Sequence, residues 1–289
     1  MPTFRFVVCL SVFFLALAFL VIAVLVGFQV IFTVPDQPQI ITQTGTELTQ
    51  DIRCIEFSDS KALDHDGKIN VLVWNIYKQN RANWQRALDE FSADKQLLLL
   101  QEASMTPSFK QWLVDGRWVS NQVSAFKALG SGAGVISIAQ GQPEKACAYT
   151  SKEPWLRLPK SALYSQYHLS NGEKLAVVNV HAINFTVGTK EYVSQLTALE
   201  MLLKHHVGPI LFAGDFNSWS ESRVNAMRQA LKAADLQEVT FLPDHRVQFI
   251  TGLPLDHVFY RGLTLKYAKA PQSDASDHNP LLLSFTLNN

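Results

Sequence analysis

The chain has 289 residues, 47% of them hydrophobic and 17% charged, which suits one large globular domain together with an unusually apolar segment. Its 25 basic and 25 acidic residues cancel, so the sequence lacks the basic stripe that a duplex-binding protein normally carries. A nucleic-acid substrate is thereby disfavoured but not excluded, because a bound metal ion can supply positive charge locally.

Residues 1–34 predict a membrane anchor. The 29 residues from Phe6 to Val34 carry no charge, and as a helix they would reach about 44 Å, more than the roughly 30 Å hydrocarbon core. No small-residue cleavage site follows, so an anchor is favoured over a signal peptide. Arg5 precedes the span and the next base is Arg53, which predicts an inner-membrane protein with its domain on the non-cytoplasmic side. A cytoplasmic domain is the alternative.

Residues 35–67 are predicted to be a linker, because they are polar, contain Pro and Thr, and show no helical apolar stripe. The cysteines at positions 9, 54 and 147 form no CxxC pair and indicate no zinc cluster. Cys54 and Cys147 could be bridged in an oxidising compartment, but two buried free thiols are the favoured interpretation.

Strand-like and helix-like segments alternate over residues 68–289, which predicts one α/β domain. In chain order they are strand 69–75, helix 82–91, strand 96–102, a helix from Pro107, a strand within 128–139, a hairpin over 160–182, helix 189–206, strand 209–214, helix 218–235 and strands 255–262 and 279–287. Asn171-Gly172 marks the hairpin turn, and Ser218 with Glu221 forms a capping box. Hairpins mixed with crossovers argue against a purely parallel sheet.

Polar side chains stand at the ends of the apolar strands. They are Asn75, Glu102, His181, Asp215, Asn217, Asp256, Asp277 and His278. Each one alone is more often a turn residue, a cap or a surface charge. Together they combine carboxylates, amides and imidazoles without a thiol, a donor set that suits Mg²⁺ or Mn²⁺ better than zinc. Period-two spacing points Asp215 and Asn217 into one shared site.

The ordered motifs "WNI", "QE", "NVHA", "GDFN", "LDHVF" and "SDHNP" resemble the endonuclease/exonuclease/phosphatase superfamily, which includes DNase I-like nucleases, over about residues 69–287. Stretches such as "LVWNIYKQ" and "AGDFNSW" are most similar to a bacterial branch called YafD-like. The resemblance implies an α/β fold, a four-layer sandwich with two central mixed β-sheets whose strand ends open on one cleft.

The resemblance also implies how the carboxylates and amides act. Glu102 corresponds to the principal Mg²⁺ ligand, with Asn75 and Asp277 near the metal. Asp215 would orient or deprotonate the attacking water, and Asn217 would hold phosphate or water.

The histidines take different roles under the same resemblance. His181 would stabilise charge on the phosphoryl oxygens or serve the leaving group, whereas abasic-site endonucleases typically carry a tyrosine there. Asp256 would hold His278 in orientation. His257 points to the other face of its strand by period two, so we interpret it as structural.

These residues predict a Mg²⁺-dependent phosphoesterase, most specifically a phosphodiesterase that uses an activated water. The substrate stays open between nucleic acid and a lipid or small-molecule diester, with Lys78, Arg157 and Lys160 as candidate phosphate contacts. The alternative is a non-catalytic, membrane-anchored binding module on the same fold. The N-terminal helix is expected to associate with the membrane, and no protein partner is predicted.

Overall fold

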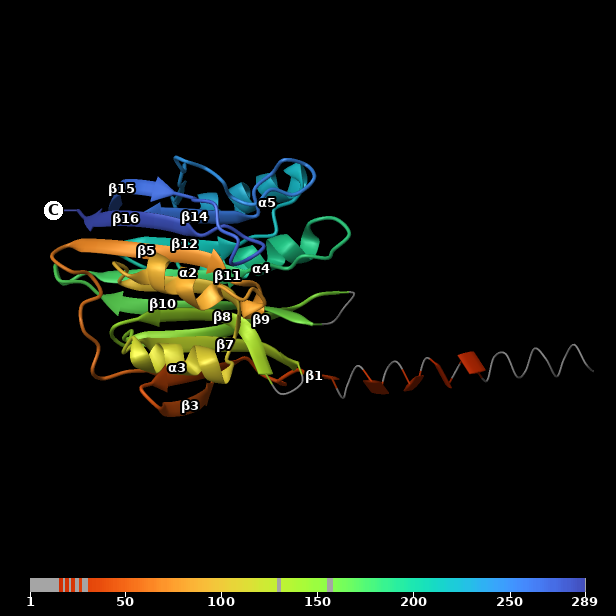
Figure 1. Cartoon of the computed structure of the whole chain (residues 1–289). Coiled ribbons are helices and arrows are strands. Elements are labelled where there is room, and N and C mark those ends of the chain that lie inside the picture. The colour runs from red at the N-terminus through yellow and green to blue at the C-terminus, as the bar shows by residue number, and fades with distance from the viewer. Residues whose placement is uncertain are drawn as a thin grey trace, which may run out of the picture.

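The computed structural model describes residues 31–128, 131–154 and 158–288, with short pieces between 16 and 27 (Figure 1). Most of the predicted anchor, and the predicted phosphate contact Arg157, lie outside the described residues. Among those that are described, no helix is long and apolar enough to span a bilayer.

Two mixed sheets form the centre of the described part of the chain. The nine-stranded sheet has the order β15 (Leu263–Lys269), β16 (Leu281–Leu287), β5 (Lys68–Asn75), β6 (Leu97–Ser104), β8 (Ser131–Ala139), β7 (Val119–Ala128), β2 (Gln39–Thr44) and β3 (Glu47–Ile52), with β1 (Phe32–Thr33) also paired to β7. The seven-stranded sheet has the order β13 (Gln237–Glu238), β14 (Asp256–Arg261), β12 (Ile210–Asp215), β11 (Lys174–His181), β10 (Pro159–His168), β9 (Lys145–Lys152) and β4 (Cys54–Glu56). The pairs β5–β6 and β11–β12 are parallel.

Side-chain alternation along the central strands explains the layers. In β5, Val71 and Val73 face the apolar core between the two sheets, and Leu72 and Trp74 face a second core on the outside. A strand buried on both faces has a continuous apolar run in its sequence, as residues 71–74 and 97–100 do. Strand β12 repeats the pattern and feeds a third core.

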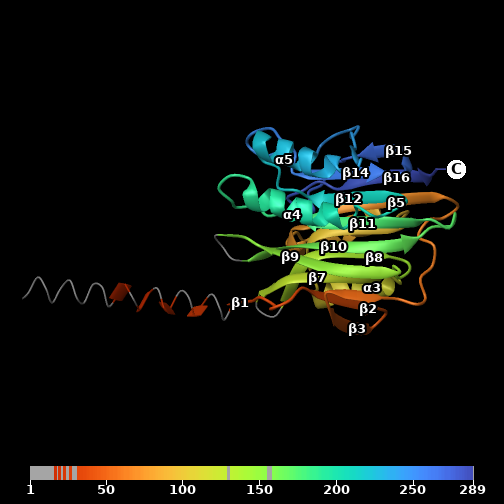
Figure 2. The ribbon, with the colours of Figure 1, turned by 180° about the vertical axis from the view of Figure 1, so that it is seen from behind.

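Helices cover both outer faces. Helices α2 (Trp84–Ser92) and α3 (Pro107–Asp115) pack on the nine-stranded sheet, and α4 (Lys190–Met201) and α5 (Glu221–Lys232) pack on the seven-stranded one. Figure 2, seen from behind, shows α4 and α5 on the face opposite α3. The order of layers is therefore helix, sheet, sheet, helix, as the family resemblance implied.

The segment 35–67 differs from the predicted linker. Its strands β2 and β3 extend the nine-stranded sheet, and β4 extends the other. Polar residues of β2 are buried but satisfied: Thr42 donates to Asn121 Oδ1 at 2.7 Å, and Gln43 donates to Lys110 O at 3.1 Å. These partners lie far away in sequence. The polar residues of β2 therefore predicted an exposed linker, although they belong to a sheet.

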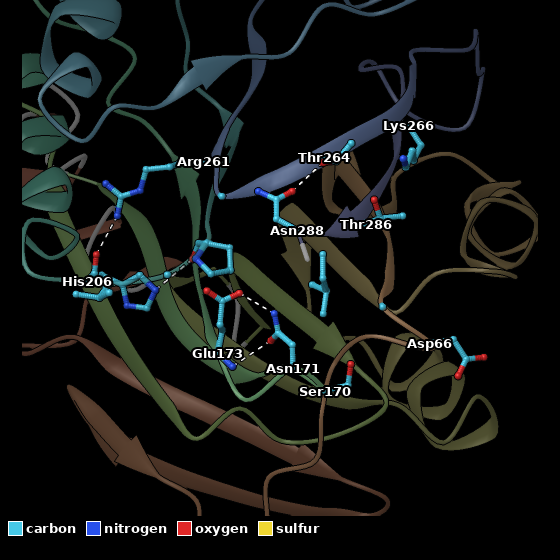
Figure 3. Close-up of a pocket in the computed structure, with 16 residues that line it drawn as sticks. Asp66, Ser170, Asn171, Glu173, His206, Arg261, Thr264, Lys266, Thr286 and Asn288 are labelled. Atoms are coloured by element: carbon cyan, nitrogen blue, oxygen red, sulfur yellow. Dashed lines mark hydrogen bonds between the residues drawn. The ribbon is translucent and has the colours of Figure 1, made fainter.

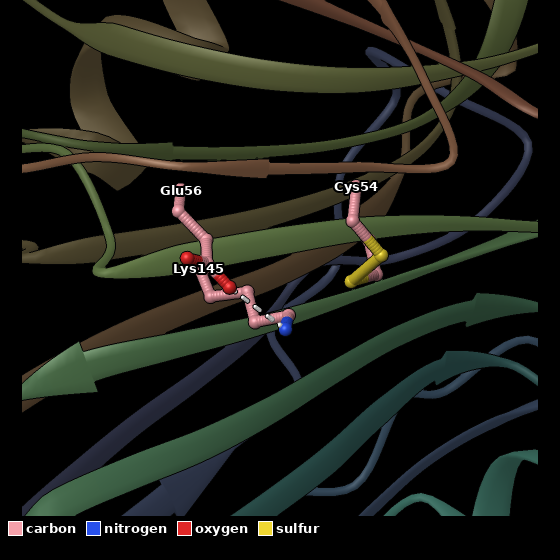
Figure 4. Close-up of a disulfide and its surroundings, with 4 residues drawn as sticks. Cys54, Glu56 and Lys145 are labelled. Atoms are coloured by element: carbon pink, nitrogen blue, oxygen red, sulfur yellow. Dashed lines mark hydrogen bonds and ion pairs between the residues drawn. A yellow bond between two sulfur atoms is a disulfide. The ribbon is translucent and has the colours of Figure 1, made fainter.

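Cys54 and Cys147 form a disulfide between β4 and β9, so the favoured interpretation as free thiols is wrong (Figure 4). The two cysteines lie directly opposite each other in the strand register, with their Cα atoms 4.1 Å apart. Glu56 and Lys145, opposite each other on the same strands, form an ion pair at 3.0 Å. The disulfide depends on strand β4, whose place in the sheet was not predicted.

Candidate functional site

The strand register brings the predicted site residues to one edge of the sandwich. On three adjacent strands of one sheet, His181 lies opposite Asp215, and Asp215 lies opposite Asp256. In the other sheet Asn75 lies opposite Gln101, next to Glu102. A cleft of about 520 Å³ lies between these strand ends. All described residues of the predicted set line this cleft except Asp256, which is hydrogen-bonded to His278. The lining members are Asn75, Lys78, Glu102, Lys160, His181, Asp215, Asn217, Asp277 and His278.

Asp215 is the buried centre of this cleft. Its Oδ2 atom accepts a hydrogen bond from Asn75 Nδ2 at 3.0 Å and lies 3.4 Å from His181 Nε2. Its Oδ1 atom accepts from the Asn217 backbone N–H at 2.9 Å. Burial raises the pKa of Asp215 to about 6, although the His278 imidazolium opposes the shift. A carboxylate with its pKa near neutrality is suited to accept a proton from water.

His278 and Asp256 form a buried pair beside Asp215. His278 Nδ1 and Asp256 Oδ2 are 2.7 Å apart, and His278 Nε2 lies 4.0 Å from Asp215 Oδ2. Burial opposes charge on the ring, but the carboxylates of Asp256 and Asp215 outweigh it and raise the pKa of His278 to about 10. Trp74 Nε1 donates to the His278 carbonyl at 2.8 Å, which fixes this loop on β5. His278 therefore stands as an imidazolium that points Nε2–H into the cleft.

His181 is held in the opposite charge state. Burial lowers its pKa well below the usual value, and the nearby Lys160 ammonium adds to the effect. Lys160 Nζ lies 2.7 Å from His181 Nε2, so the ammonium donates to a neutral ring. Of the two histidines in the cleft, His181 is thus neutral and His278 is charged. Such a separation of pKa values between neighbouring groups is typical of acid–base sites.

Glu102 reaches the cleft through an unusual backbone conformation. Its φ is +52°, and the ladder between β6 and β8 shifts register around it. A bulge of this kind re-aims a side chain at the end of a strand. Glu102 Oε2 accepts from Lys78 Nζ at 2.5 Å, and Oε1 lies 3.9 Å from His181 Nε2.

Lys78 is placed by a short left-handed turn. Tyr77, Lys78 and Gln79 have φ of 49°, 53° and 56°, although none is a glycine. Gln79 exchanges two hydrogen bonds of 3.1 Å with the backbone of Ser104, so the turn is fastened to the strand that carries Glu102. Backbone of this type is sparsely populated and concentrates at functional sites.

Arg223 is a positioning residue that the sequence reasoning missed. Its guanidinium donates to the backbone carbonyls of Asn217, at 2.8 Å, and Ile183, and it lies 4.1 Å from the centre of the Tyr192 ring. It thereby joins the loops that follow β12 and β11. The sequence contains a sign of this role. Arg223 lies on the same buried face of α5 as Met227, and an arginine among apolar residues on a helix face requires hydrogen-bond acceptors for its guanidinium.

His257 points away from the cleft, as period two indicated. Its Nδ1 lies 2.7 Å from Glu238 Oε1, and its Nε2 lies 2.8 Å from Ser218 Oγ. The arrangement resembles a nucleophilic triad, but Ser218 is fully buried and its hydroxyl donates to Pro254 O at 2.6 Å. We therefore interpret this trio as a structural hydrogen-bond network.

The oxygen donors of the cleft fit a hard divalent cation. Glu102 and the exposed Asp277 face the same cavity as the Asn75 amide, a set suited to Mg²⁺ or Mn²⁺. Asp215, Asp256 and His278 also offer ligand atoms within 4.8 Å of one another. In that second group, however, Asp256 and His278 already bind each other, so it fits acid–base chemistry better than a metal cage.

A larger groove of about 1300 Å³ lies at the opposite end of the strands (Figure 3). Arg261 there donates to the backbone carbonyls of Ala234 and His206, each at 2.9 Å. None of the described residues in the predicted site lines this groove. Cavity size is therefore a poor guide to the site in this molecule, and the clustered titratable groups are the better one.

Comparison with known proteins agrees with this geometry. A family model described as the endonuclease/exonuclease/phosphatase family matches residues 72–278. A UPF0294 protein of Vibrio parahaemolyticus is 82% identical over 276 residues, covering 96% of this chain and 98% of the relative. Assignment to the YafD-like branch stays a prediction.

Two solved structures share the fold. One is D. rerio TDP2 in complex with a single-strand DNA product, at 17% identity and a TM-score of 0.55 over 76% of this chain and 100% of that one. The other is a mannosyl-6-phosphatase of Bacteroides thetaiotaomicron, at 15% identity and a TM-score of 0.55 over 76% of this chain and 100% of that one.

Proposed function

Because the chain belongs to the endonuclease/exonuclease/phosphatase family, we propose that it is a divalent-metal-dependent phosphoesterase, and more specifically a phosphodiesterase. The observation that carries the proposal is the buried Asp215 carboxylate, with its raised pKa, between a neutral His181 and a charged His278. The single-strand DNA product bound to D. rerio TDP2 and the mannosyl-6-phosphatase of Bacteroides thetaiotaomicron support phosphate-ester chemistry on this fold.

A divalent ion would be held by Glu102 and Asp277 with help from Asn75, and when bound it would neutralise charge on the nonbridging phosphate oxygens. Asn217, whose Nδ2 donates to Ala182 O at 2.9 Å, keeps its amide at the edge of the cleft, where it can hold phosphate or water. His278 donates its Nε2–H to a phosphate oxygen. Asp256 holds that ring in place.

The protons balance within the cleft. Asp215 takes a proton from water as the water oxygen bonds to phosphorus and the P–O bond to the leaving alcohol breaks. The leaving oxygen takes a proton from the Lys160–His181 pair, whose nitrogens are 2.7 Å apart. The products are a phosphomonoester and an alcohol, and proton exchange with solvent restores Asp215 and Lys160.

The test is hydrolysis of bis(p-nitrophenyl) phosphate and of the matching monoester by the purified full chain with Mg²⁺, Mn²⁺ or chelator. We expect metal-dependent cleavage of the diester. Loss of a general base should lower kcat by about 10²–10⁴ in Asp215→Asn, and Glu102→Gln should abolish the metal response. Glu173→Gln, in the groove at the far end, is the matched control. Full activity in both cleft variants would refute the proposal, and no turnover with any metal would favour a binding module.

We further infer that the domain lies on the non-cytoplasmic side of the inner membrane. The Cys54–Cys147 disulfide supports this side, because such bonds persist in oxidising compartments. Protease treatment of intact spheroplasts should digest the domain. Protection until the membrane is lysed would place it in the cytoplasm.

A further inference from the structure

The cleft opens beside the point where the apolar N-terminal segment joins the domain. Strand β1 pairs with Lys127 and Ala128 of β7, and the ring of Phe32 lies 5.9 Å from that of Phe126. Phe126 lines a cavity of about 140 Å³ that adjoins the cleft and shares its polar groups Lys78, Glu102, Lys160 and His181. The described end of the uncharged segment, at Phe32 and Thr33, therefore lies against a residue that lines the smaller cavity. Figures 1 and 2 show β1 on the same side of the molecule as the loop that precedes α4.

Exposed apolar side chains stand at the rim of the cleft. Phe185, 54% exposed, lines both cavities, and Val187 in the same loop is 77% exposed. Phe249 also lines the cleft, packed against Trp219, and its neighbour Ile250 is 95% exposed. Apolar groups gathered around a polar cleft indicate a partner that is itself apolar.

Few free cations line the described cleft. Glu102 offsets the charge of Lys78 and Asp256 offsets that of His278, whereas Lys160 donates to a neutral His181 and keeps its charge. The whole chain carries no net charge. A polynucleotide requires free cations along its phosphates, so this cleft is better suited to a single phosphate group on an apolar carrier.

We infer that the cleft faces the bilayer surface and that its substrate is the phosphodiester group of a phospholipid held there. This inference rests on the proposed phosphodiesterase function. The phosphate meets Asp215 and His278, and the glycerol and upper acyl chains lie along Phe126 and Phe185. Val187 and Ile250 enter the interfacial layer, where apolar side chains are stabilised.

The orientation is tested without any enzyme activity. The full chain with Cys9→Ser receives one new cysteine, as Val187→Cys, Ile250→Cys or Val207→Cys, and a polarity-sensitive dye is attached to that cysteine. Each labelled protein is placed in vesicles of phosphatidylethanolamine and phosphatidylglycerol. Val207 is the matched control, because it is 93% exposed and lines the groove at the opposite end of the strands. Emission should shift to the blue at 187 and 250 and not at 207. Equal emission at all three positions overturns the inference.

The substrate is tested by the ratio of vesicle-phospholipid hydrolysis to soluble-diester hydrolysis. Val187→Asp/Ile250→Asp should lower this ratio about tenfold, equivalent to 1.4 kcal/mol, and Val207→Asp should leave it unchanged. Cleavage of the soluble diester with no cleavage of vesicle lipid, or preferred cleavage of a single-stranded oligonucleotide, overturns the substrate class alone. Absence of hydrolysis of every ester overturns the proposed function instead, and the dye still decides the orientation.

Discussion

Arg223→Met tests whether one buried guanidinium holds two loops of the site together. Arg223 is 1% exposed and donates to the carbonyls of Asn217 and Ile183 and to Thr186 Oγ1. Methionine fills much of the volume but leaves two buried carbonyls without donors. Each such group costs about 1–3 kcal/mol, so the free energy of unfolding should fall by about 2–6 kcal/mol, or roughly 10 °C in Tm.

The control is the same substitution on the same helix. Arg228 pairs with Glu238 at 2.9 Å, but its side chain is 56% exposed, and an exposed pair contributes about 0–1 kcal/mol. Urea unfolding of the full chain in detergent, followed by circular dichroism, compares Arg223→Met with Arg228→Met.

Activity supplies a second readout. Misplacement of the Asn217 loop should lower kcat about 100-fold, with Arg223→Lys intermediate because an ammonium retains the charge but not the fork of donors. Equal stability of the two Met variants, together with unchanged kcat in Arg223→Met, would refute the positioning role.

Two further changes have calculable consequences. Gly214→Ala should prevent folding or strongly reduce soluble yield, because Gly214 has φ +143° and an added Cβ would lie 2.0 Å from the Val180 carbonyl oxygen; normal yield and Tm would contradict the close packing of β11 and β12. Burial opposes ionisation of Glu238, but hydrogen bonds from His257 and Arg228 outweigh it and lower the pKa from 4.5 to about 2. A lowered pKa stabilises the fold above pH 4.5, and this stability is lost as pH falls from about 4.5 to 2. The stability difference between wild type and Glu238→Gln should therefore shrink to about half between pH 6 and pH 3; a difference that is independent of pH would be inconsistent with the shift.

Local pattern was sufficient to predict the central strands and the polar residues at their ends. The residues before Asn75 and Asp215 are mostly apolar because those strands are buried on both faces, and a strand buried on both faces has a nearly continuous apolar sequence. Convergence of the polar ends follows from parallel pairing of neighbouring strands, which places their carboxyl ends at one edge. The four layers and the shared cleft were not predicted from local pattern; they were implied by the family resemblance that the ordered motifs carry.

The features that were missed depend on contacts distant in sequence. Strand β2 looked like a linker because its polar side chains have partners on β7 and α3, and the Cys54–Cys147 bridge depended on finding β4. The left-handed conformation of Glu102 has no marker either, since no glycine announces it. Such information resides in the packed structure and not in any short stretch of sequence.

The left-handed backbone at the cleft positions the ion pair between Lys78 and Glu102. Residues at φ near +50° each cost about 1–2 kcal/mol, and four of them, Tyr77, Lys78, Gln79 and Glu102, surround one ion pair. The cost is tolerable because the Gln79–Ser104 bonds and the flanking sheets hold this backbone in place. In return, the turn holds the Lys78 ammonium against the Glu102 carboxylate. A relaxed turn would leave the half-buried Glu102 carboxylate without this cation, so the strained turn stabilises the site at the expense of its own local conformation.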